Sequence, residues 1–147
     1  MPLSLQRRRQ LRKISVFVLG LGFVGIGLLH FIRPEPFEAI VPPFLPWARA
    51  IVYLSGVAEI ALGVGVLVPR TRRLAAWGLI ALLVAVFPAN LYHAFGDVQL
   101  ASMQAPLVYH VIRLPMQLVL IAWAWWHTRP ELPAAPLDLS ASARGAT

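Results

Sequence analysis

The sequence predicts an all-α membrane protein, in which four transmembrane helices form a bundle and a short interfacial helix lies in the first outer loop. Four apolar runs, at about 14–32, 50–68, 74–92 and 107–126, are each long enough to cross a hydrocarbon core of about 30 Å. Of the 147 residues, 59% are hydrophobic and 13% are charged, whereas about 25% charged is usual in a soluble domain. The buried helices of a soluble bundle would each show a charged face, and these runs do not.

The segment before the first run, residues 1–13, is basic. Its positive charges are Arg7, Arg8, Arg9, Arg12 and Lys13. We interpret it as the cytoplasmic flank of a membrane span rather than as a nucleic-acid-binding patch, because an apolar run follows it directly. That run is too long for the apolar core of a secretory signal, and no A-x-A cleavage pattern follows it. Residues 14–32 are therefore expected to remain in the protein as the first span.

The loop between the first two spans, residues 33–49, contains several prolines yet keeps large apolar side chains. Phe37 and Phe44 are examples, and a disordered linker would carry few such residues. We therefore expect a short helix at about 35–41, lying at the membrane interface over the outer end of the bundle. The second span, 50–68, follows this loop.

The remaining segments complete the predicted organisation. Residues 69–73 form a tight basic turn, and a polar loop precedes the fourth span. The membrane domain is thus 14–127, and 128–147 are expected to be a disordered cytoplasmic tail, because they are rich in Pro, Ala and Ser. Lys and Arg gather on the side of the two termini, whereas the opposite side carries only Arg33 and Arg49. Both termini are therefore expected in the cytoplasm, with the chain in a bacterial-type cytoplasmic membrane.

Five polar side chains are predicted to share one layer of the bundle. Glu59 lies about 13 Å below the outer surface, where a carboxylate costs on the order of a few kcal/mol unless it is protonated or partnered. Because successive spans alternate in direction, the other members of the layer also fall in the outer half: His30, Asn90, Arg113 and Gln117. Arg113 is the expected counter-ion of Glu59, since a guanidinium can bind a carboxylate through two hydrogen bonds.

Helical spacing extends this layer. Ser55 lies one turn before Glu59 on the second span, and Tyr109, Arg113 and Gln117 share one face of the fourth. In one interpretation these residues bind a ligand or relay protons. The residues so assigned are Glu59, Arg113, His30, Asn90, Gln117, Ser55 and Tyr109. In the other interpretation the same groups only hydrogen-bond helix to helix and lock the bundle.

Cysteine is absent from the sequence, so no disulfide, thiol redox chemistry, thiolate metal site or cysteine-ligated iron–sulfur cluster is expected. A metal site from His30, His93, His110 and Glu59 is a weaker alternative, because no H-x-x-x-H pair supports it, and no metal is predicted. His110 and His127 are interpreted as interfacial. The sequence contains no flavin, haem or nucleotide motif, so no cofactor is evident from motifs, and no catalytic residue is assigned.

Several short motifs within residues 14–127 resemble those of the DoxX-like family of four-helix membrane proteins. They are His30-Phe-x-x-Pro34, Ile40-Val-Pro-Pro43, Ser55-Gly-x-x-Glu59-x-x-x-Gly63, Leu67-x-Pro-x-Thr-Arg72, Phe87-Pro-Ala-Asn90 and Arg113-Leu-Pro-x-Gln117. The resemblance implies a four-span bundle and a link to membrane redox, since DoxX itself is named as a small subunit of a thiosulfate:quinone oxidoreductase. Relatives are tied to oxidative-stress complexes. The thiol chemistry of a relative does not carry over to a chain without cysteine.

Three functions are compatible with these features. The first is an accessory subunit of a membrane redox or stress-response complex, with the Glu59/Arg113 site binding a quinone or another lipid-soluble ligand. The second is a non-catalytic assembly or interaction subunit, and the third is a small proton-coupled transporter. The expected partners are the lipid bilayer, a membrane or soluble oxidoreductase and a second copy of the chain, with no nucleic acid. The chain is not expected to be an enzyme on its own.

Overall fold

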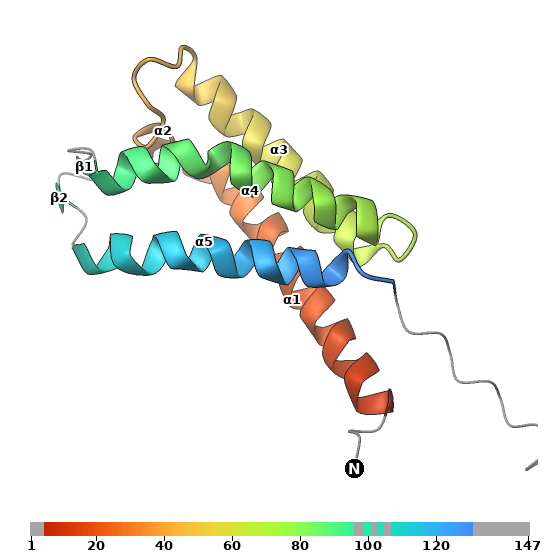
Figure 1. The fold of residues 1–147 in the computed structure, drawn as a ribbon. Coiled ribbons are helices and arrows are strands. Elements are labelled where there is room, and N and C mark those ends of the chain that lie inside the picture. The colour runs from red at the N-terminus through yellow and green to blue at the C-terminus, as the bar shows by residue number, and fades with distance from the viewer. Residues whose placement is uncertain (1–4, 96–98, 101–102, 105–106, 131–147) are drawn as a thin grey trace, which may run out of the picture.

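The computed structural model describes residues 5–95, 99–100, 103–104 and 107–130, with side chains described for 6–92, 94–95 and 112–130. Its helices are α1 (Leu5–Ile32), α2 (Glu35–Glu38), α3 (Ala48–Leu67), α4 (Arg72–Phe95) and α5 (Leu107–His127). The strands β1 (Gln99–Leu100) and β2 (Met103–Gln104) pair antiparallel between α4 and α5. Apart from this pair, the described chain is all-helical, as predicted (Figure 1).

Three helices are long and apolar enough to cross a membrane. They are Gln6–Ile32 in α1, Ala48–Leu67, which is α3, and Arg72–Tyr92 in α4. Large apolar side chains stand on their outer faces, such as Leu54, which is 69% exposed, and Leu74, which is 77% exposed. Apolar surface on this scale is expected where lipid rather than water surrounds a helix. The chain is therefore a membrane protein, and the residues predicted as a fourth span form α5, a helix of 21 residues that is not among these three.

Helix α1 begins earlier than the predicted first span. The basic residues 6–13 are part of the same helix instead of a separate segment before it. Arg, Lys, Gln and Leu have high helix propensity, and neither Gly nor Pro occurs between residue 5 and residue 19. The helix therefore carries its positive charges beyond the apolar run, to its own N-terminal end.

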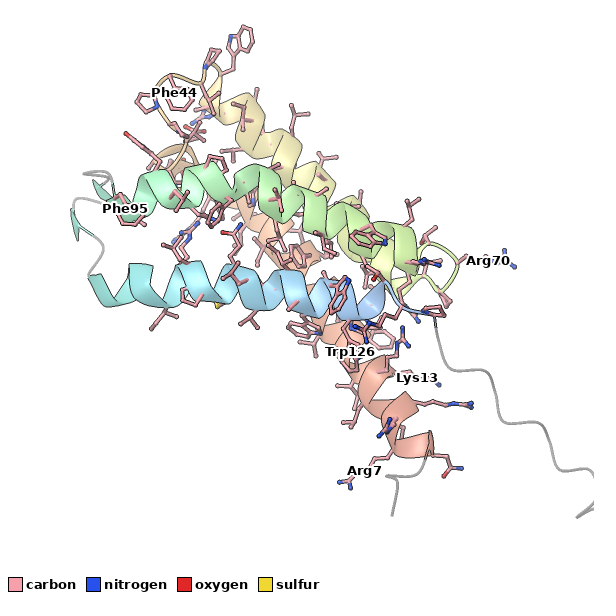
Figure 2. All side chains as sticks on the ribbon, viewed as in Figure 1. Arg7, Lys13, Phe44, Arg70, Phe95 and Trp126 are labelled. Carbon is pink, nitrogen blue, oxygen red and sulfur yellow. The ribbon has the colours of Figure 1, made fainter. Side chains whose placement is uncertain are left out.

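The two ends of the molecule differ in charge. Arg7, Lys13 and Arg70 lie at one end, whereas Phe44 and Phe95 lie at the other (Figure 2). We call the first the basic end and the second, where α2 lies, the α2 end. Charges separated in this way are typical of a membrane protein with a preferred orientation.

The short helix expected in the proline-rich loop is confirmed as α2, although it ends at Glu38 rather than at about residue 41. Pro36 lies in its first turn, where the missing backbone N–H would have no helical partner in any case. Arg49 at the start of α3 donates a hydrogen bond of 2.5 Å to Glu38. Between the two helices, Trp47 adopts a left-handed conformation (φ 58°), which turns the chain into α3.

The long helices pack in chain order, α1 against α3, α3 against α4 and α4 against α5. Helices α1 and α3 approach most closely at two pairs of glycines. A Cβ atom added to Gly27 would lie 2.7 Å from the carbonyl oxygen of Gly56, and one added to Gly20 would lie 2.8 Å from that of Gly63. Small residues at membrane helix contacts allow this backbone approach.

The buried apolar core lies toward the basic end and receives side chains from all four long helices. It comprises Val16, Leu19, Phe23, Val66, Ala75, Leu79, Leu83 and Ala124. Phe23 and Leu83 belong both to this core and to the wall of a cavity that continues toward the α2 end. The fold thus packs one half of the bundle tightly and leaves space in the other.

Candidate functional site

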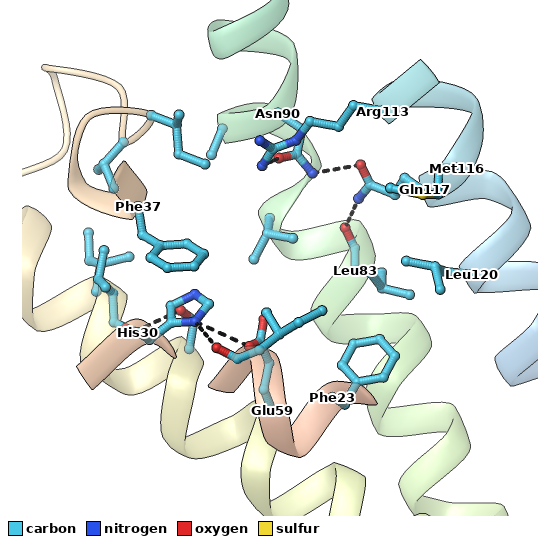
Figure 3. Close-up of a pocket in the computed structure, with 18 of the residues that line it drawn as sticks. Phe23, His30, Phe37, Glu59, Leu83, Asn90, Arg113, Met116, Gln117 and Leu120 are labelled. Carbon is cyan, nitrogen blue, oxygen red and sulfur yellow. Dashed lines mark hydrogen bonds and ion pairs between the residues drawn. The ribbon is translucent and has the colours of Figure 1, made fainter. Parts of the chain in front are cut away.

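The cavity has a volume of about 350 Å³ and is lined by residues from α1, α2, α3, α4 and α5 (Figure 3). Most of its wall is apolar, with Phe23, Val52 and Leu120 among the lining residues. A volume of this size is within the usual range for small-molecule sites, which are concave, mostly apolar and furnished with a few polar groups. Here those polar groups lie on two walls.

All but one of the residues predicted as a ligand or proton site line this cavity. They are His30, Ser55, Glu59, Asn90, Arg113 and Gln117. Tyr109, the remaining one, lies outside the described side chains, as do His93 and His110. The structure therefore brings polar side chains from four helices to the lining of one cavity.

The first polar wall joins α1 to α3. His30 and Glu59 are buried, with 6% and 9% of their surfaces exposed. The imidazole Nδ1 lies 2.9 Å from the carbonyl oxygen of Ile26 and 3.4 Å from Glu59 Oε2. Because a carbonyl oxygen accepts hydrogen bonds and cannot donate them, Nδ1 carries a hydrogen and donates it to Ile26, whereas its contact with Glu59 is longer. Glu59 Oε2 is buried and accepts no properly formed hydrogen bond from the described residues.

An aromatic ring closes this wall from the α2 side. Phe37 of α2 stacks on the imidazole of His30 with ring centroids 3.8 Å apart and planes inclined by 23°. Ser55 also lines the cavity, but its hydroxyl donates to the carbonyl oxygen of Val52 in its own helix, at 2.9 Å. Ser55 therefore has a hydrogen-bond acceptor within its own helix, as His30 does in Ile26 of α1.

The second polar wall is a chain of hydrogen bonds between α4 and α5. Arg113 donates to Asn90 Oδ1 at 2.6 Å, and Asn90 Nδ2 donates to Gln117 Oε1 at 2.8 Å. Gln117 in turn donates to the carbonyl oxygen of Leu83 at 2.6 Å. Each amide accepts from one neighbour and donates to the next, so the chain is consistent in direction from the guanidinium to the backbone.

The partner of Glu59 differs from the one predicted. The sequence predicts Arg113 as its counter-ion, whereas the ion-pair contact seen in the described residues is with His30, and Arg113 bonds to Asn90. The reason is helix order. α5 packs against α4, and α3 packs against α1, so the guanidinium and the carboxylate stand on different walls.

A second polar cluster lies at the basic end, where the sequence predicts no comparable group. Trp123 Nε1 donates to Ser15 Oγ at 2.6 Å, and the same hydroxyl is hydrogen-bonded to His127 Nε2 at 2.9 Å. His127 is only 1% exposed, so its side chain is buried within the protein, and its position at the membrane interface stays a prediction. Trp123 and His127 are four residues apart on α5, and this spacing together with the serine in the first apolar run was the signal available in the sequence.

The two walls offer different chemistry to anything in the cavity. Glu59 and His30 are groups that exchange protons, whereas Arg113 supplies hydrogen-bond donors on a positive charge. Among the described residues, no group of three His, Asp or Glu side chains could hold a metal ion. The arrangement is suited to binding a small apolar molecule that carries polar atoms at two positions.

A protein-family model described as "Domain of unknown function (DUF8561)" matches residues 19–128. These residues include the four long helices from Leu19 onward and every described residue of the two cavity walls. Neither the curated proteins nor the solved structures give a match. None of these findings refers to the DoxX-like family, so that resemblance stays a prediction.

Proposed function

This chain belongs to the family described as Domain of unknown function (DUF8561), and we propose that it is an accessory membrane protein that binds a quinone or another lipid-soluble ligand in the cavity between its helices. In this proposal α5 is the fourth transmembrane helix, α2 lies at the membrane interface, and both termini face the cytoplasm of a bacterial-type membrane. The chain serves a membrane redox or stress-response complex, in line with the resemblance to DoxX-like proteins.

The carboxylate of Glu59 carries the proposal. Its Oε2 atom is buried beside an apolar cavity and accepts no properly formed hydrogen bond from the described residues. Buried polar atoms in proteins nearly always have a partner, and one without a partner in hydrocarbon is expensive. A bound molecule with a hydrogen-bond donor would supply the missing hydrogen bond, which the 3.4 Å contact with His30 does not provide.

The opposite wall favours a molecule with an acceptor oxygen at its other end. Arg113 has five N–H donors, and it lines the cavity beside Asn90. A quinone carries two carbonyl oxygens on opposite sides of its ring, and reduction turns each into a hydroxyl that also donates. Such a molecule can satisfy an acceptor such as Glu59 in its reduced form and a donor such as Arg113 in either form.

Native mass spectrometry of the detergent-extracted protein tests the proposal. The wild type is expected to carry a quinone- or lipid-sized adduct, and Glu59→Gln is expected to lose most of it. Glu35→Gln is the matched control, because Glu35 is an exposed carboxylate at the start of α2 that does not line the cavity, so the adduct of this variant should equal that of the wild type. Helical content by circular dichroism and elution as a single species verify that each variant is folded.

A second candidate function is favoured by the hydrogen-bond chain from Arg113 to Leu83. A chain of this kind holds α4 against α5 whether or not anything binds, as expected of an assembly subunit whose polar layer locks the bundle. In that case neither wild type nor Glu59→Gln carries an adduct. Variants of the chain then lose folding or capture of the partner complex, and the ligand proposal is abandoned.

A further inference from the structure

The cavity is covered at the α2 end by α2 and the residues after it. Phe37 stacks on His30, and Ile40 is buried with 9% of its surface exposed. The hydrogen bond between Arg49 and Glu38 ties α2 to the start of α3. A water-borne molecule approaching along the axis of α1 and α3 would therefore meet this cover first.

The side of the cavity between α1 and α5 is different. Three lining residues there are both apolar and exposed: Ile26 of α1 at 42%, and Ile112 and Met116 of α5 at 59% and 51%. A residue that lines a cavity and is also exposed marks a place where the cavity reaches the surface. Ile51 of α3 is the fourth lining residue of this kind, at 36%.

The packing of the helices explains why this side is open. α1 and α5 form no extended interface in the described part of the chain. They meet at the basic end, where Ser15 of α1 is hydrogen-bonded to Trp123 and His127 of α5. From there the two helices diverge toward the α2 end, as Figure 1 shows. The exposed cavity-lining residues Ile26, Ile112 and Met116 mark the opening of the cavity between these two helices, and we call this opening the wedge.

We infer that the cavity receives an amphipathic lipid with a compact polar head and a long apolar tail, the head lying between the two polar walls and the tail leaving through the wedge past Ile26 and Met116. This inference rests on the proposed function and names the shape of its ligand. The head satisfies Glu59 on one side and meets Arg113 on the other. The tail covers apolar side chains that would otherwise contact the lipid directly.

The wedge also selects the source of the ligand. Its rim is apolar, so a molecule that enters through it arrives from the hydrocarbon region of the membrane and not from water. Measured from water, binding is expected to depend on the tail, because the transfer of each methylene group from water to an apolar surface is favourable. A tail-free head should reach the same polar walls but bind more weakly.

The test compares decylubiquinone with its tail-free head, 2,3-dimethoxy-5-methylbenzoquinone, by titration in native mass spectrometry. Wild-type protein is expected to bind the tailed compound at least about ten-fold more tightly than the head alone. The double variant Ile26→Trp/Met116→Trp, which narrows the wedge, should lose about ten-fold in affinity for the tailed compound and much less for the head. The matched control is Leu21→Trp/Leu118→Trp, on the same two helices at residues that are exposed but do not line the cavity, and it should bind like the wild type.

Each result has one meaning. Equal affinity of the wild type for both compounds would overturn the inference that the ligand is bound through its tail, and would leave the proposed site in place. If Ile51→Trp loses binding and the double variant at the wedge does not, the cavity opens beside α3 instead, and the inference is also overturned. Binding of neither compound to folded wild type removes the proposed quinone function, and the wedge inference with it.

Discussion

Asn90 and Ser55 both line the cavity, but the hydrogen bonds of Asn90 connect two helices, whereas that of Ser55 stays within one helix. Asn90 of α4 accepts from Arg113 and donates to Gln117, both on α5. Ser55 donates to the carbonyl oxygen of Val52 in its own helix. Hydrogen bonds between membrane helices contribute about 0.6 kcal/mol on average and up to about 1.7 kcal/mol. Asn90 therefore stabilises a contact between helices, whereas the hydroxyl of Ser55 does not.

Replacing these two residues separates the roles. Asn90→Ala is expected to lower the free energy of unfolding by about 1–2 kcal/mol, because it removes two hydrogen bonds between helices and leaves Gln117 without its donor. Ser55→Ala is expected to change it by less than about 0.5 kcal/mol. Unfolding in detergent micelles, followed by circular dichroism, measures both. Similar losses in the two variants would contradict a hydrogen-bond chain that holds α4 to α5.

At the scale of the helices, α1 is held mainly by α3. Its glycines divide into two sets on opposite sides of the helix. Gly20 and Gly27 face the backbone of α3, whereas Cβ atoms added to Gly22 and Gly25 would meet nothing within 4 Å. The close approach at Gly27 also brings α1 next to Glu59 of α3, since an added Cβ would lie 3.1 Å from the Cβ of that residue. Helix contact and the first polar wall therefore depend on the same glycine.

Alanine substitutions at these two kinds of glycine should act in opposite directions. Gly27→Ala is expected to destabilise the protein by about 1–3 kcal/mol, because the new methyl group meets the backbone of Gly56 and the two helices must move apart. Gly25→Ala faces open space and should be neutral or stabilising by up to about 1 kcal/mol through its higher helix propensity. Thermal unfolding of both variants in the same detergent tests this. Destabilisation by Gly25→Ala would show that another surface covers that face of α1.

At the scale of the whole molecule, the sequence predicts which residues lie at similar depth but not which helices are neighbours. The depth of a residue follows from the rise of 1.5 Å per residue, and the face it occupies follows from helical spacing. The grouping of His30, Glu59, Asn90 and Gln117 could therefore be predicted from the sequence. Neighbouring helices are selected by packing and interhelical hydrogen bonds, which a single apolar run does not reveal. The sequence therefore predicts the wrong partner for Glu59.

The same limit explains why the sequence did not predict the polar cluster at the basic end. Ser15 and His127 belong to the first and last long helices, and no local pattern relates two residues so far apart in the chain. The early start of α1 has a different cause. The distinction between a charged flank and an apolar span concerns hydropathy, whereas helix formation depends on backbone propensity, which is high in both segments. The helix therefore continues through residues 6–13.

The proposed topology can be tested because the chain has no cysteine, so that any single cysteine is a unique label. Exposed, uncharged positions exist at both ends: Gln10, Pro69 and Pro130 toward the basic end, and Phe44, which is 78% exposed, at the α2 end. In intact bacterial cells a membrane-impermeant maleimide should label Phe44→Cys and spare the three variants at the basic end until the cells are made permeable.

The position after α5 decides the number of spans. If α5 crosses the membrane, Pro130→Cys is protected together with Pro69→Cys. If it does not, Pro130→Cys is labelled from outside like Phe44→Cys, and the fourth span of the proposal is wrong.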